Sequence, residues 1–76
     1  MLVKHSISIK GHRTSYSLEP EFHEELQRLS ERDAIPLARL IARIDLQRDG
    51  ETNLSSALRL YVLRNLREAA DTSRNP

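Results

Sequence analysis

A stretch near the start of the chain alternates polar side chains with less polar ones: Arg13-Thr14-Ser15-Tyr16-Ser17-Leu18. A period of two is typical of a half-buried β-strand, in which successive side chains point to opposite faces. Arg13, Ser15 and Ser17 therefore share one face, while the less polar residues face a core. Arginine can bind guanine through two hydrogen bonds, and serine can bond to base edges or phosphates, so this face suits contact with nucleic acid.

Motifs for catalysis or metal binding are absent from the sequence. It has no cysteine, no glycine-rich phosphate loop and no zinc-protease histidine pair. The three histidines, His5, His12 and His23, are too scattered to predict a metal site. Ser15 lies near His12, but nothing marks an acid that would orient a catalytic pair. We therefore expect no enzymatic activity, no cofactor and no metal.

Positive charge is concentrated at the N-terminal end of a chain whose net charge is only +1. Residues 1–18 contain Lys4, Lys10 and Arg13 and no acidic residue, so they carry +3. The rest of the chain holds nine of the 12 basic residues and all 11 acidic ones, a net charge of −2. A local basic face on a nearly neutral protein indicates a polyanionic partner there, although an ordinary solvated terminus would show the same charge.

The residues before this strand alternate as well: Leu2-Val3-Lys4-His5-Ser6-Ile7-Ser8-Ile9. The pattern predicts a first strand over residues 2–9, which Lys10-Gly11-His12 would turn back onto residues 13–18 as a hairpin. Gly11 is one of only two glycines and stands where a tight turn needs one. The alternative is an arm that becomes ordered only on a partner.

Everything downstream has helical periodicity. Three helices and a short tail are expected, at about residues 20–32, 36–47, 53–70 and 71–76. Pro20 and Pro36 suit a first helical turn because proline loses no backbone bond there, and Asn53 is a good N-cap. Phe22, Leu26 and Leu29 form the apolar stripe of the first helix. His23 lies between two of these positions, and it is expected to face solvent.

The third helix is apolar on most of its surface, through Leu54, Ala57, Leu58, Leu60, Tyr61, Val62, Leu63 and Leu66. A chain of 76 residues forms a single domain with a small core, and two short helices are too few to cover a third on every side. We therefore expect a homodimer. No apolar run reaches the length of a membrane span, and the lack of cysteine and of a secretion signal suits the cytoplasm.

Three longer motifs stand out: Gly11-His12-Arg13-Thr14-Ser15, Ser17-Leu18-Glu19-Pro20-Glu21-Phe22 and Asn53-Leu54-Ser55-Ser56-Ala57-Leu58-Arg59-Leu60. With the order strand, helix, helix over residues 13 to about 46, the chain resembles the ribbon-helix-helix superfamily (the Arc, MetJ and CopG-like group), and most closely its short bacterial members. The resemblance implies a mainly α fold with short β. It would be an intertwined homodimer with an antiparallel intersubunit β-ribbon, an extra N-terminal strand or arm and a third helix.

The resemblance also implies where double-stranded DNA would bind. The groove-reading positions of the superfamily fall on Arg13, Ser15 and Ser17, and its phosphate-clamping amides fall at the start of the second helix. The expected DNA-binding residues are Lys10, His12, Arg13, Ser15, Ser17, Leu37, Ala38 and Arg39. Pro36 replaces the capping serine or threonine that is usual in the superfamily, so one amide and one hydroxyl are missing there.

We therefore expect a bacterial transcriptional regulator that reads the major groove with a dimeric ribbon. The alternative is a protein-interaction module, an antitoxin-like or scaffolding dimer whose helices bind a protein partner and which binds DNA weakly or not at all. One geometric problem accompanies the first expectation. If residues 2–9 form an outer strand, the dimer has four strands, which is too wide for a groove of about 12 Å.

Overall fold

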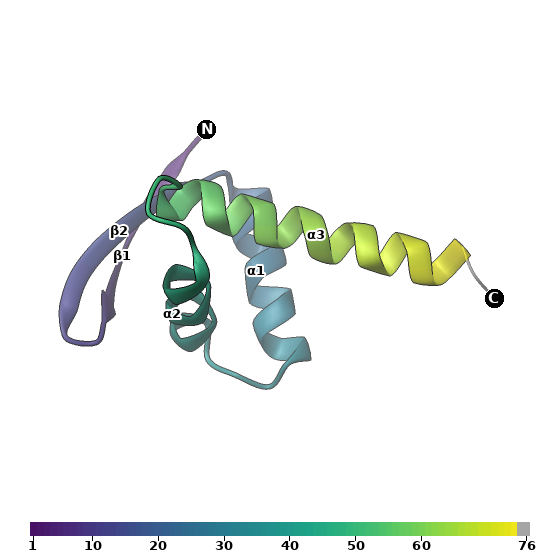
Figure 1. Cartoon of the computed structure of the whole chain (residues 1–76), viewed down its shortest axis with the longest axis horizontal. Helices are drawn as coiled ribbons and strands as arrows, with labels where there is room; N and C mark the ends of the chain where they lie inside the picture. Colours follow the sequence, from purple (N-terminus) through teal and green to yellow (C-terminus); the bar gives the residue numbers. More distant parts are fainter. Residues whose placement is uncertain (75–76) are drawn as a thin grey trace.

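The alternating residues at the N-terminal end form an antiparallel hairpin in the computed structural model, which describes residues 1–74. Its strands, β1 (Val3–Ile9) and β2 (His12–Leu18), pair along their whole length. The N-terminal residues therefore form a strand within the chain rather than a free arm. Figure 1 shows the hairpin curving at one end of the molecule, with the three helices on one side of it.

The turn of the hairpin consists of Lys10 and Gly11, which both have positive φ angles, 51° and 81°. The expected turn also included His12, which is wrong: His12 begins β2 and pairs with Ile9. Positive φ at both central residues is the backbone of a type I′ turn, whose twist matches that of the flanking strands. Glycine adopts this conformation freely, whereas a residue with a side chain loses about 1 kcal/mol or more in it. Lys10 therefore holds a strained conformation at the exposed tip of the hairpin.

The first helix, α1 (Pro20–Arg32), ends in a tight turn that reverses the chain. Ala34 takes a φ of 56° there, in the left-handed region. The Ile35 amide donates to the Ser30 carbonyl over 3.0 Å, and the Ala34 amide donates to the Glu31 carbonyl over 3.1 Å. These two bonds make a Schellman motif, in which glycine usually occupies the position that Ala34 holds.

The other two helices begin in different ways. α2 (Leu37–Gln47) follows Pro36, whose extended backbone caps the helix without a side-chain bond. α3 (Leu54–Arg74) follows Asn53, whose Oδ1 accepts a hydrogen bond from the Ser56 amide over 2.8 Å. Asn53 is therefore the N-cap that the sequence predicts.

α3 is longer than expected, so the predicted tail over residues 71–76 is wrong as far as residue 74. No glycine or proline follows Ala70 before Pro76, so no residue in this stretch stops the helix. The Thr72 hydroxyl donates to the Glu68 carbonyl over 2.9 Å, as a helical residue does. Residues 75–76 of the expected tail lie outside the described part of the chain.

The core lies between the hairpin, α1, α2 and the first half of α3. It is built from the buried side chains of Tyr16, Leu18, Leu26, Leu29, Leu40, Ile41, Ile44, Leu54, Ala57, Leu58 and Val62. The expected class, mainly α with short β, is confirmed for the single chain. Within residues 1–74, no helix has both the length and the apolar character needed to cross a membrane.

α3 extends beyond this core. Figure 1 shows it running along the long axis of the molecule and out past α1. Leu60, Leu63 and Leu66 lie on it with exposed fractions of 40%, 40% and 46%. We call these three residues the α3 stripe. Apolar side chains aligned on one helix and left half uncovered are typical of a surface that another molecule covers.

Candidate nucleic-acid interface

The hairpin places six polar side chains on the face that points away from the helices. We call this set the polar face: Lys4, Ser6, Ser8, Arg13, Ser15 and Ser17. The register sets Lys4 opposite Ser17, Ser6 opposite Ser15 and Ser8 opposite Arg13. All of these side chains are exposed except that of Ser17, which is half-buried. The alternation read from the sequence therefore describes both faces of the hairpin correctly.

The basic side chains of the hairpin have no acidic partner. Lys4, Lys10 and Arg13 are exposed, and within residues 1–74 none of them forms an ion pair. Such a surface attracts an anion without first having to break an internal salt bridge.

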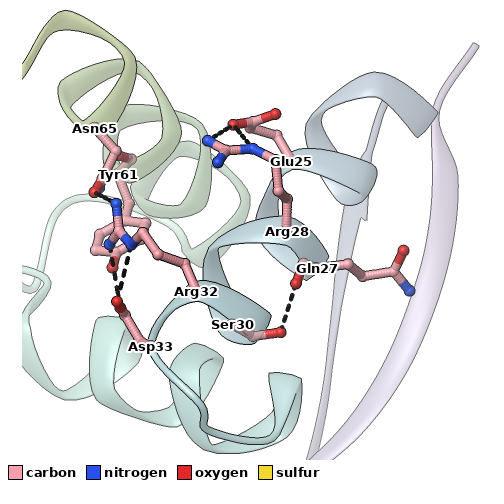
Figure 2. A network of polar contacts seen from close by, with 8 residues as sticks. All are labelled: Glu25, Gln27, Arg28, Ser30, Arg32, Asp33, Tyr61 and Asn65. Carbon is pink, nitrogen blue, oxygen red and sulfur yellow. Dashed lines mark hydrogen bonds and ion pairs between the residues drawn. The ribbon is translucent and has the colours of Figure 1, made fainter. Parts of the chain in front are cut away.

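Several arginines of the helical part, in contrast, bind carboxylates of the same chain. Figure 2 shows Arg28 of α1 bound to Glu25, and Arg32 bound to Asp33 over 2.9 Å. Arg32 also donates to the side chain of Asn65 on α3 over 3.1 Å, which ties the two helices together. These cations contribute to the helical scaffold, whereas those of the hairpin face solvent alone.

The opposite face of the hairpin is held on α1 by three stacked rings. The His5 and His23 rings lie 4.0 Å apart between centroids and only 4° from parallel, and the Tyr16 ring stacks on His5 at 5.2 Å. Tyr16 Oη and His23 Nε2 are joined by a hydrogen bond of 3.1 Å. His23 is half-buried, so the expectation that it faces solvent is wrong. His23 lies beside the apolar stripe of α1 and packs against His5 of β1. Helical periodicity alone does not reveal this contact with the hairpin.

Burial affects the protonation of this ring cluster. Desolvation lowers the pKa of His23, and the nearby His5 ring lowers it further because two adjacent imidazolium groups repel each other. Desolvation also raises the pKa of Tyr16, so its hydroxyl remains protonated near neutral pH and can donate to His23. The cluster therefore favours the neutral form of His23.

The C-terminal end of β2 is fastened to the start of α3. The Ser17 amide donates to Oγ of Ser55 over 2.9 Å. One residue past the strand, the Glu19 carboxylate accepts a hydrogen bond from Arg59 over 3.1 Å, and the Arg59 guanidinium lies 5.9 Å from the centre of the Phe22 ring. β2 is therefore fixed to the helices in two places, through Tyr16 on its inner face and through the Ser17 amide at its C-terminal end.

The residues predicted to bind DNA fall into three groups. Arg13, Ser15 and Ser17 share the polar face, with Ser17 partly covered. Lys10 lies at the tip of the hairpin. His12 is also exposed there, but by its position in the strand it belongs to the face opposite Arg13.

The third group is at the start of α2, which packs against β1. Leu37 is half-buried, whereas Ala38 and Arg39 are exposed. The Leu37 and Ala38 amides have no carbonyl one turn earlier to bind, because they open the helix. The Arg39 amide instead donates to the Pro36 carbonyl over 3.0 Å, so only its side chain is available to an anion.

Two residues that the sequence did not single out join the polar face. Ser6 and Ser8 lie directly across from Ser15 and Arg13. Their signal was the alternation of residues 2–9, but their position opposite β2 depends on the two-residue turn of the structure, which sets the register of the hairpin. No group of three or more metal-ligating side chains occurs within residues 1–74.

Comparison with known proteins gives one match. A family model described as a ribbon-helix-helix domain matches residues 2–66, which includes both strands, the first two helices and more than half of α3. No curated protein and no solved structure matches the chain.

Proposed function

Since this chain belongs to the ribbon-helix-helix domain family, we propose that it is a homodimeric, sequence-specific DNA-binding protein that regulates transcription in a bacterial cytoplasm. The observation that carries the proposal is the polar face. It combines exposed basic and hydroxyl side chains, contains no carboxylate, and is held rigidly on the helices by the ring cluster. A rigid element that presents such groups is the form in which proteins read base edges.

Arg13 and Ser15 are the residues proposed to read bases. Arginine binds the O6 and N7 atoms of guanine through two hydrogen bonds, and serine donates to or accepts from most base edges. Both side chains are exposed on β2, and the short serine beside the arginine lets the backbone approach the bases. The major groove admits a two-stranded antiparallel ribbon, which two copies of β2 would form.

β1 then has to lie outside the groove. In a dimer whose β2 strands pair, the order across the sheet is β1, β2, β2 and β1, so each β1 flanks the central ribbon. Lys4 on β1 and Lys10 at the tip would face the phosphates that border the groove. Figure 1 shows that the hairpin is curved and not flat. A curved four-stranded sheet can place the central β2 strands in the groove while the outer β1 strands bend away from the bases.

The start of α2 is proposed to bind a phosphate. The unpaired amides of Leu37 and Ala38, the positive end of the helix dipole and the exposed Arg39 side chain together favour an anion. Pro36 removes one amide from this site, so the contact is weaker than one capped by serine.

The α3 stripe supports the dimer part of the proposal. Leu66 also lines a groove between α1 and α3, together with Phe22, Val62, Glu21 and Glu25. The described chain supplies nothing to cover this apolar surface. A second copy of the chain would cover it and enlarge a core that is small for a single domain.

Binding to DNA with and without Arg13 tests the proposed function. Arg13→Ala should weaken binding to a selected site about tenfold or more for each half-site, and it should relax the sequence preference there. Arg67→Ala is the matched control, because Arg67 is an exposed arginine on α3, away from the hairpin. Equal losses for the two variants would mean that only net charge matters, which would contradict specific reading by the hairpin.

The α3 stripe also favours a second candidate, a module whose helices bind another protein. Purification of the protein with a stoichiometric partner, from a dimer without affinity for DNA, would support this candidate. Variants of Leu63 would then disrupt the partner complex, and Arg13→Ala would leave it intact.

A further inference from the structure

The backbone of β2 has one edge that β1 does not cover. Because the turn contains only Lys10 and Gly11, Ile9 and His12 form the hydrogen-bonded pair that closes the hairpin. Hydrogen-bonded and non-hydrogen-bonded pairs alternate along an antiparallel ladder. The odd-numbered residues Arg13, Ser15 and Ser17 therefore point their amides and carbonyls away from β1. We call this side the outer edge of β2.

The outer edge is open over only part of its length. The Ser17 amide is already bonded to Ser55 Oγ over 2.9 Å, and Ser17 is half-buried beside the start of α3. Arg13 and Ser15 are exposed, and within residues 1–74 their outward amides and carbonyls have no protein partner. An unpaired strand edge of this kind binds another strand readily.

A second copy of β2 can pair with this edge in few symmetric registers. Odd-numbered residues must face odd-numbered residues, since only these carry outward backbone groups. A register centred on Arg13 sets that arginine opposite its own copy. Repulsion between the two positive charges disfavours this register. Registers centred on Ser15 or Tyr16 need the Ser17 amide, which Ser55 occupies.

We propose that Ser55 sets the register of the intersubunit ribbon and places Thr14 on the two-fold axis. This inference rests on the proposed dimer. Arg13 of each copy then faces Ser15 of the other, so only unoccupied backbone groups are used. The two arginines lie diagonally across the ribbon, which separates their charges and directs them to different base pairs. Ser55 acts as a positioning residue: it touches no DNA, but it determines the spacing at which the two arginines read it.

The absence of cysteine from the chain allows a direct test by disulfide cross-linking. With Thr14 on the axis, the two Thr14 residues form a non-hydrogen-bonded pair about 4.5 Å apart between Cα atoms, within disulfide reach. The two Ser15 residues are then diagonal neighbours, beyond about 7 Å, and cannot be bridged easily. Thr14→Cys should therefore oxidise to a covalent dimer at least about tenfold faster than Ser15→Cys.

Removal of the Ser55 hydroxyl should loosen this preference. In a Ser55→Ala background the Ser17 amide is released, so cross-linking through Ser15→Cys should speed up and that through Thr14→Cys should slow down. Ser56→Ala is the matched control, since it alters the neighbouring serine and should leave the pattern unchanged. Cross-linked fractions are measured on non-reducing gels, and the mass of each variant is measured before oxidation by sedimentation.

Three outcomes would overturn the inference. Faster cross-linking through Ser15→Cys than through Thr14→Cys would mean that the two-fold axis does not lie at Thr14. Lack of cross-linking by both variants in a chain that sediments as a dimer would mean that the dimer forms elsewhere. A monomer would refute the proposed dimer itself. None of these measurements depends on affinity for DNA. The proposed register could therefore be correct even if the protein bound no DNA.

A measurement on the unmodified protein covers the case in which a variant fails to fold. In a dimer mixed from differently labelled copies, the register centred on Thr14 sets Tyr16 of one copy opposite His12 of the other. An intersubunit contact between the α-protons of these residues is expected in nuclear magnetic resonance spectra. A contact between Thr14 and Tyr16 instead would place the axis on Ser15 and refute the proposal.

Discussion

Lys10 provides the most informative single substitution, because the structure gives it opposite effects on stability and on binding. It holds a φ of 51° as the first residue of a type I′ turn, and Gly11 follows with 81°. Asparagine before glycine is the most favourable pair for such a turn. A left-handed conformation costs an ordinary residue about 1–2 kcal/mol, of which asparagine relieves a part. We therefore expect Lys10→Asn to raise the free energy of unfolding by about 0.5–1 kcal/mol.

The same substitution should weaken binding to DNA. Lys10 is exposed at the tip of the hairpin, where the proposed complex places a phosphate. Loss of one phosphate contact lowers the slope of log affinity against log salt by about 0.9, so a dimer loses about 1.8. Urea unfolding measures the first effect, and fluorescence anisotropy over a salt series measures the second. Lys10→Arg is the control, since it keeps both the charge and the unfavourable turn residue.

Two results would refute the reasoning on Lys10. A lower free energy of unfolding for Lys10→Asn would mean that the turn does not have the left-handed backbone described. An unchanged salt slope would mean that Lys10 makes no phosphate contact, and the strain at this residue would then have no functional explanation.

Three further predictions concern the scaffold. Ala34→Gly should raise the free energy of unfolding by about 1 kcal/mol in urea titrations because Ala34 has positive φ, whereas the control Ala70→Gly should lower it, since it lies within α3. Burial, and then His5, lower the pKa of His23 in the folded protein. The contribution of His23 to the free energy of unfolding should therefore be complete above pH 6.5, its pKa in the unfolded chain, and should be lost as the pH falls below that value. Urea unfolding between about pH 8 and about pH 5 should show this loss, and a variant His23→Gln with the same pH dependence would contradict it. Leu63→Glu should raise the dissociation constant of the dimer at least about fivefold by sedimentation, and a dimer of unchanged affinity would place the interface away from the α3 stripe.

The hairpin shows how much of this fold the sequence contains. Alternation over residues 2–9 and 13–18 predicts two strands with polar and apolar faces, and Gly11 predicts the turn between them. Once the turn has two residues, the register follows, because a one-residue shift would turn every apolar side chain outward. The two faces were therefore predictable from local patterns, but the expected turn was one residue too long, because His12 begins β2 and pairs with Ile9.

Contacts between distant residues were not predictable in this way. His23 packs on His5, and Ser55 bonds to the Ser17 amide, across 18 and 38 positions of the sequence. The sequence around a histidine or a serine does not show whether its side chain packs against other residues or faces solvent. The extra turn of α3 was missed for a related reason: Asp71 and Thr72 are weak helix formers, and only the absence of a glycine or proline stop indicated that the helix continues.

The claim that the hairpin reads DNA is tested most directly by selection from a pool of random duplexes at low salt with the purified protein. We predict enrichment of a two-fold symmetric sequence, because a symmetric dimer reads the same bases in each half-site. Arg13→Ala should lose that enrichment, while Arg67→Ala should retain it. A folded dimer that enriches no sequence and retains no DNA at low salt would contradict the account.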